Sequence, residues 1–107
     1  MNSSIHDGRA DRVLRVELKG VRSKKALLET LATGLALPRH FGHNWDALAD
    51  CLMDEQWAKS GSICVLLMGS AGAERRFGAE WTTLAGILGE AADWWRERGR
   101  DFHTVLV

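Results

Sequence analysis

The sequence predicts an α/β fold in which three to four helices cover a small three-stranded parallel sheet. Residues 12–18 alternate apolar and charged side chains, a pattern typical of a strand with one solvated face. Residues 63–68 form a continuous apolar run, which indicates a buried strand. Residues 102–107 provide a third short strand, and segments with helical spacing separate all three. Helical connections between strands favour parallel pairing with right-handed crossovers.

The first helix is expected to begin at Ser23, whose hydroxyl makes it a good N-cap. Gly34 can end this helix, and the only proline of the sequence, Pro38, prevents its continuation. Four leucines at helical spacing form its predicted core face: Leu27, Leu28, Leu31 and Leu35.

A second helix is expected after the loop at residues 38–43. Asn44 is a suitable N-cap, and Asp46 falls in the first turn, where the helix dipole favours an anion. We expect one side of this helix to carry Trp45, Leu48, Ala49, Leu52 and Gln56.

The second half of the chain is expected to contain a turn at residues 69–78, with one short helix, and then a long helix at residues 79–98. Gly99 ends the long helix. Its predicted core face consists of Trp81, Leu84, Ala85, Leu88, Ala92 and Trp95. Residues 12–107 therefore form one predicted domain, preceded by a loose lead-in at residues 1–11.

Composition excludes several classes of protein. The 14 basic and 14 acidic residues give zero net charge, which argues against a nucleic-acid-binding protein. No apolar stretch is long enough to span a membrane, and the first residues lack the pattern of a secretory signal. Cys51 and Cys64 have no metal-binding or redox spacing, so we expect two reduced, buried thiols. A cytoplasmic protein without a cofactor is expected.

The most unusual charge pattern lies between residues 41 and 56, which include four acids and no lysine or arginine. Asp46, Asp50 and Asp54 recur every four residues, so on one helix they would lie within an arc of roughly 80°. Like charges at this spacing destabilise a helix by about 0.2–0.5 kcal/mol per pair. The pattern predicts either a docking surface for a cationic partner or a merely solvated acidic face.

The same part of the sequence can also be interpreted as a metal-binding site or as the active site of an enzyme. His40, His43, Asp46 and Asp50 follow one another at intervals of three, three and four residues, and such side chains can bind a metal in a hydrolase. The histidines, however, precede the predicted N-cap and match no zinc motif. The sequence also contains no nucleophile elbow and no phosphate-binding loop. We therefore expect no catalytic residues and no bound metal.

Residues 35–52 read Leu-Ala-Leu-Pro-Arg-His-Phe-Gly-His-Asn-Trp-Asp-Ala-Leu-Ala-Asp-Cys-Leu, and this segment closely resembles the barstar family of intracellular barnase inhibitors. The resemblance implies a three-stranded parallel sheet covered by helices, in agreement with the pattern of the whole chain. It also implies that the second helix and the loop before it enter the cleft of a basic ribonuclease.

The resemblance assigns roles to particular residues. Asp50 matches the acid that mimics an RNA phosphate, and Asp46 matches a second interfacial acid. Gly42 and Asn44 match loop positions at the interface, and His40 takes the place of an interfacial tyrosine.

Other positions depart from the family pattern. Trp45 replaces an aliphatic residue and Met53 a threonine, and Trp94 stands where the family has an interfacial acid on its last helix. Trp94 is thus either an aromatic anchor at the interface or a peripherally packed side chain. Together with Asp54, these residues complete the predicted binding surface. The predicted partner is a basic ribonuclease related to barnase; an immunity protein for an unrelated toxin is the alternative.

Overall fold

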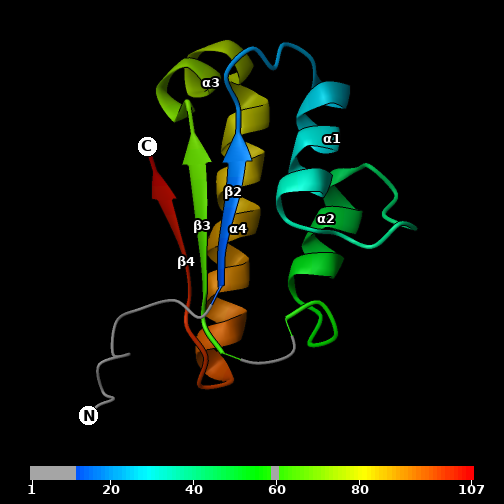
Figure 1. Cartoon of the computed structure of the whole chain (residues 1–107), viewed down its shortest axis with the longest axis vertical. Coiled ribbons are helices and arrows are strands. Elements are labelled where there is room, and N and C mark those ends of the chain that lie inside the picture. Colours follow the sequence, from blue (N-terminus) through cyan, green and yellow to red (C-terminus); the bar gives the residue numbers. More distant parts are fainter. Residues whose placement is uncertain (1–11, 59–60) are drawn as a thin grey trace.

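A three-stranded parallel sheet forms the centre of the protein (Figure 1). The computed structural model describes residues 12–58 and 61–107, so the expected lead-in at residues 1–11 lies outside the described residues. The strands are ordered β2-β3-β4 and span Arg12–Glu17, Ile63–Met68 and Phe102–Leu106. Both strand pairs are parallel, which confirms the predicted α/β fold.

The helices lie behind and beside this sheet, as Figure 1 shows. α1 packs on β2, and α4 packs on β4. α2 contacts α4, and the short α3 leads from β3 into α4. The four helices are α1 (Lys24–Gly34), α2 (Trp45–Leu52), α3 (Ser70–Phe77) and α4 (Ala79–Glu97).

Both predicted N-caps are confirmed. The Ser23 hydroxyl accepts a hydrogen bond from the Ala26 amide, and the Asn44 side-chain oxygen accepts one from the Ala47 amide. Each cap satisfies an amide that would otherwise lack a partner in the first turn. The starts of α1 and α2 are therefore fixed by their own sequences.

The expected extension of the second helix to Gln56 is wrong, because α2 ends at Leu52. The Met53 amide still bonds to the Ala49 carbonyl, but the Asp54 carboxylate then accepts the Gln56 amide at 2.8 Å. A side-chain bond of this kind offers the main chain an alternative to the helix. Asp54 consequently lies in a turn, two residues past the helix.

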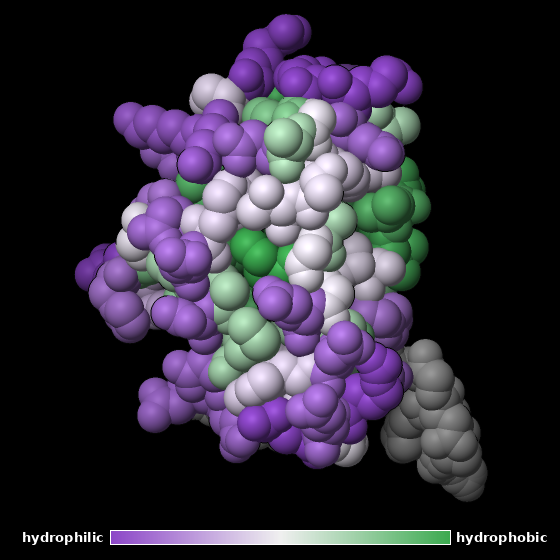
Figure 2. Space-filling model, turned by 180° about the vertical axis from the view of Figure 1, so that it is seen from behind, coloured by the Kyte–Doolittle hydropathy of each residue, from purple (hydrophilic) through white to green (hydrophobic). Residues whose placement is uncertain are grey.

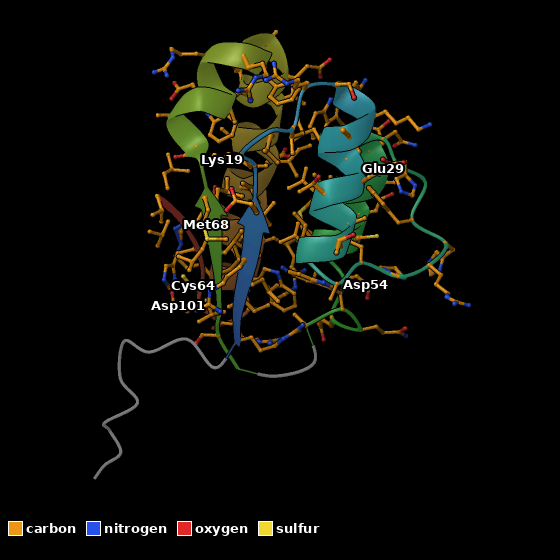
Figure 3. All side chains as sticks on the ribbon, turned by 45° about the horizontal axis from the view of Figure 1, so that its top comes forward. Lys19, Glu29, Asp54, Cys64, Met68 and Asp101 are labelled. Carbon is orange, nitrogen blue, oxygen red and sulfur yellow. The ribbon has the colours of Figure 1, made fainter. Side chains whose placement is uncertain are left out.

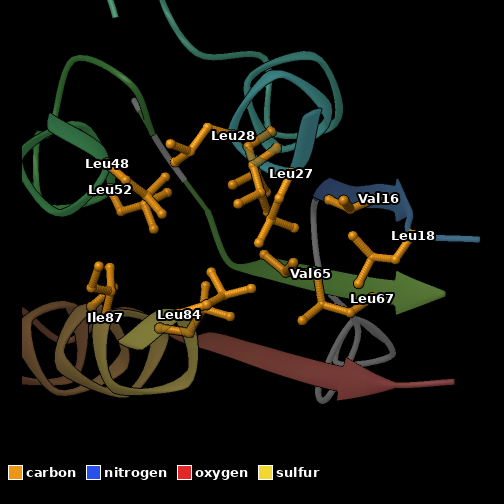
Figure 4. Packing of buried hydrophobic residues seen from close by; sticks show 14 of the residues in the cluster. Val16, Leu18, Leu27, Leu28, Leu48, Leu52, Val65, Leu67, Leu84 and Ile87 are labelled. Carbon is orange, nitrogen blue, oxygen red and sulfur yellow. The ribbon is translucent and has the colours of Figure 1, made fainter. Parts of the chain in front are cut away.

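The hydrophobic core lies where α1, α2 and α4 meet the sheet (Figure 4). The predicted core face of α4 was rotated relative to the observed one: Ile87 and Ala91 are buried, whereas Ala85 is exposed. α2 covers the side of α4 that carries Ile87, while the sheet ends at β4 and leaves Ala85 uncovered. Tertiary packing therefore decides which flank of the helix is buried.

Gly34 allows α1 to approach β2 closely. A Cβ atom added at Gly34 would lie 2.7 Å from the Arg15 carbonyl oxygen and 2.8 Å from a methyl carbon of Val16. Such distances are well below van der Waals contact, so the last turn of α1 touches the strand only because residue 34 has no side chain. This contact fixes where the loop toward α2 begins.

We predict that Gly34→Ala destabilises the protein by about 1–3 kcal/mol, because the added methyl group must push α1 away from β2. Gly86 is the matched control, since a Cβ there meets open space within α4. Gly86→Ala should stabilise the fold by about 0.5–1 kcal/mol through helix propensity. Urea unfolding of both variants measures the contrast, and equal effects of the two substitutions would refute the close-approach argument.

Candidate protein-binding interface

α2 is held on α4 at both of its ends. Near its start, the Trp45 indole N–H donates to the Glu80 carboxylate at 2.7 Å. At its last residue, the Leu52 carbonyl accepts the Trp95 indole N–H at 2.8 Å. Leu48 and Leu52 are fully buried between these two contacts. The helix is therefore a rigid platform, and its outer face is presented in a fixed orientation.

The outer side of this platform is acidic. Asp46 and Asp50 on α2 are exposed, and so is Asp54 in the following turn. The ion pairs among the described residues all involve Arg96 or Arg98, and none includes these three acids. We call Asp46, Asp50 and Asp54 the acidic face. Its negative charge is not neutralised by an ion pair within the described chain.

A cleft of ≈ 560 Å³ opens beside the acidic face. The loop before α2, α2 itself and the turn after it form its walls. The residues that line it are Ala36, Pro38, His40, Phe41, Gly42, Ala47, Asp50, Cys51, Asp54, Gln56 and Trp57. The cleft thus brings together four of the predicted binding residues: His40, Gly42, Asp50 and Asp54.

The remaining predicted residues around α2 lie outside this cleft. Asn44 caps the helix, and its side-chain nitrogen also donates to the Gly42 carbonyl at 3.3 Å. Asp46 is exposed on the first turn, and Met53 is half-buried at the helix end. Trp45 is half-buried and turned toward Glu80, so its indole N–H is already used inside the protein.

Trp94 lies on α4, apart from the cleft, and is half-buried. Its ring packs edge-on against Trp95 at a centroid distance of 4.7 Å, and the Arg98 guanidinium lies 3.6 Å from its centroid. The Arg98 Nε atom is also 3.9 Å from a carboxylate oxygen of Glu55, in the turn after α2. The ring is therefore partly covered by its own chain, and its role at an interface stays a prediction.

Two aromatic residues of the cleft were missed by the sequence analysis. The Trp57 indole N–H donates to the Leu35 carbonyl at 2.8 Å and so ties the turn after α2 to the end of α1. Phe41 is buried, and its ring centroid lies 4.9 Å from that of His43. The presence of Phe41 in the motif was visible in the sequence. The position of Trp57 depends on where α2 ends, and no local pattern in the sequence predicts that end.

His40, His43, Asp46 and Asp50 do not converge on a common point. Across residues 12–58 and 61–107, no group of three or more His, Cys, Asp or Glu side chains is arranged to hold a metal ion. Within the same residues, no helix is long and apolar enough to cross a membrane.

The family model described as Barstar (barnase inhibitor) matches residues 12–107, nearly the whole chain. The chain belongs to the barstar family. No curated protein matches the sequence. Membership in the barstar family fits the fold, since both the three-stranded parallel sheet and the second helix with its preceding loop are present.

The thiol of Cys51 is sensitive to the negative charge of this surface. It is half-buried rather than buried as expected, and it lines the cleft. Burial raises the pKa of its thiol above the ordinary value, and the negative charges of Asp54 and Asp50 raise the pKa further. Cys64 is buried in β3, far from Asp54, as Figure 3 shows.

We predict that Asp54→Asn and Asp50→Asn each speed the alkylation of Cys51 by iodoacetamide near pH 8. Removing a negative charge lowers the thiol pKa toward its ordinary value, so more reactive thiolate is present at a given pH. Peptide mapping by mass spectrometry separates Cys51 from Cys64. Glu74→Gln, an equal charge change at an exposed site on α3, should leave the rate unchanged. Equal rates in all variants would contradict the electrostatic argument.

Proposed function

We propose that this protein inhibits a basic ribonuclease of the barnase type by placing the Asp50 carboxylate where the enzyme binds RNA phosphate. The observation that carries the proposal is an exposed Asp50, in no ion pair of the described chain, on a helix anchored at both ends. Membership in the barstar family supports the same assignment. The inhibitor acts in the cytoplasm, where Cys51 and Cys64 remain reduced.

The physical basis is complementarity of charge. A ribonuclease concentrates arginine and lysine side chains to hold phosphate, so a rigid carboxylate finds donors that are already in place. Because α2 is fixed on α4, little conformational entropy is lost when Asp50 binds. Because the protein has zero net charge, the attraction of a cationic partner depends on local excesses of acidic residues such as the acidic face.

The cleft beside Asp50 is suited to bind a side chain of the enzyme. Asp50 and Asp54 line it with negative charge, while Phe41 and Trp57 contribute aromatic carbon. This combination suits a basic side chain, whose cation pairs with the carboxylates and whose aliphatic stem covers the rings. His40, which is exposed and also lines the cleft, adds a third ring on which an arginine can stack.

We predict different kinetic effects for Asp50 and Asp54. Asp50→Ala should weaken inhibition by about 2–5 kcal/mol, mainly through faster dissociation, because a buried basic group of the enzyme loses its partner. Asp54→Ala should cost less than about 1 kcal/mol and should mainly flatten the dependence of the association rate on salt. Stopped-flow binding to a barnase-type ribonuclease at several salt concentrations measures both effects.

Glu74→Ala is the matched control, because it removes one exposed negative charge from α3, outside the acidic face. Its association and dissociation rates should remain those of the wild type. Wild-type affinity of the Asp50→Ala variant would refute the phosphate-mimic mechanism. Tight binding of a partner that does not cleave RNA would instead assign the acidic face to immunity against a different toxin.

We also predict that Trp94→Ala weakens binding of the ribonuclease by more than about 1 kcal/mol, with Trp94 acting as an aromatic anchor beside the acidic face. The half-buried ring should contribute much less to stability than the buried Trp95. Isothermal titration and thermal unfolding of Trp94→Ala provide the two readouts. Unchanged affinity together with a large loss of stability would assign Trp94 to packing.

A further inference from the structure

The C-terminal end of α4 carries an arginine whose guanidinium is held over an aromatic ring. The Arg98 Cζ atom lies 3.6 Å from the centroid of the Trp94 ring. Its Nη1 atom also donates to the Trp94 carbonyl at 2.9 Å. A guanidinium this close to the face of a tryptophan makes a cation–π interaction. Figure 2, which views the molecule from behind, shows strongly hydrophilic atoms at the lower end of this face, where α4 ends.

Two carboxylates flank the same guanidinium without binding it tightly. An oxygen of Glu55 lies 3.9 Å from the Arg98 Nε atom, and an oxygen of Glu97 lies 4.0 Å from Nη1. Both distances are longer than a hydrogen bond. The Glu55 and Glu97 side chains are 72% and 76% exposed, so solvent screens both ion pairs. Arg98 is therefore held mainly by the ring and the carbonyl of Trp94.

The groups around Arg98 form a binding site for a cation. The Trp94 ring is fixed in position, because it packs edge-on against the buried Trp95. Glu97 comes from the same helix, whereas Glu55 comes from the turn after α2. We call Trp94, Glu55 and Glu97 the cation site. An aromatic face beside carboxylates suits a guanidinium, whose plane stacks on the ring while its N–H groups pair with the acids.

The cation site adjoins the acidic face. Glu55 directly follows Asp54 in the turn after α2, and both side chains are exposed. A basic partner that covers the acidic face therefore also approaches Glu55 and Trp94. In the free protein this partner meets the positive charge of Arg98, which repels it and keeps the ring from it.

We propose that Arg98 stands in for a basic side chain of the partner, and that a partner arginine or lysine displaces it from the cation site on binding. The inference rests on the proposed function, since it takes the partner to be a basic ribonuclease. Displacement is feasible because the Arg98 side chain is 38% exposed, lies at the end of a helix and regains water when it leaves.

The exchange makes the surface selective. A ribonuclease with a basic side chain aligned with the Trp94 ring replaces one guanidinium contact by another and loses little. A basic protein without an aligned side chain cannot remove Arg98 and is repelled by its charge. Arg98 thus lowers the affinity for every basic partner, and it does so most for partners that do not fit.

Two other roles of Arg98 predict a different result when the residue is removed. If Arg98 paired with an acid of the partner, its loss would weaken binding. If it only capped the last carbonyls of α4, its loss would leave the affinity unchanged or lower it through fraying of the helix. Tighter binding after removal of Arg98 is expected only if the residue competes with the partner.

A tetra-arginine peptide tests the cation site without the ribonuclease. By isothermal titration in 0.15 M salt, Arg98→Gln should bind the peptide about two- to fivefold more tightly than the wild type, the worth of one exposed cation–π contact. The gain should disappear in Arg98→Gln/Trp94→Ala. Arg96→Gln is the matched control, because Arg96 pairs with Asp93 in the same part of α4. It should change the affinity by less than about 1.5-fold. No gain in Arg98→Gln, or a gain that persists without Trp94, overturns the proposal.

Stopped-flow binding to a barnase-type ribonuclease tests the competition itself. Arg98→Gln should slow dissociation about two- to fivefold, whereas Arg96→Gln should leave the dissociation rate unchanged. If Asp50→Ala weakens binding as expected but Arg98→Gln dissociates as fast as the wild type or faster, the competition is refuted and the proposed function stands. If the ribonuclease is not bound but the peptide shows the gain that depends on Trp94, the proposed function fails and the cation site stands.

Discussion

Two indole N–H groups determine how this protein presents its acidic face. Trp45 donates to Glu80, and Trp95 donates to the Leu52 carbonyl, so the short α2 is attached to the long α4 at its first and last residues. A helix of eight residues has little stability of its own in water. These two hydrogen bonds, with Leu48 buried between them, fix the position of the two acids on α2, Asp46 and Asp50.

The arrangement separates the residues that stabilise α2 from those that face a partner. Leu48 and Leu52 are buried, whereas Asp46 and Asp50 are exposed and raise the free energy of the free protein by repelling one another. A surface that served stability alone would carry lysine or arginine between them. A basic partner relieves this repulsion, so part of the binding energy comes from the unfavourable charge pattern of the unbound protein.

Local signals in the sequence predicted the features that depend on neighbouring residues alone. Asn44 capped α2 as expected, because an N-cap needs only its own side chain and an amide three residues on. The end of α2 was not predicted, since the turn at Asp54 replaces a helix that the apolar spacing would have continued. The burial of Ile87 in place of Ala85 depends on packing between distant elements, and Trp57 reaches the cleft for the same reason.

The central claim is that Asp50 acts by pairing with a basic group of a ribonuclease cleft. A double-mutant cycle measures this pairing directly: Asp50→Ala is combined with an arginine-to-alanine substitution at the phosphate site of a barnase-type enzyme, and inhibition constants are determined for all four pairs. The account predicts a coupling energy of at least about 1.5 kcal/mol for Asp50, and less than about 0.5 kcal/mol for Asp54 with the same arginine. Additive effects of the two substitutions, within about 0.5 kcal/mol, would contradict it.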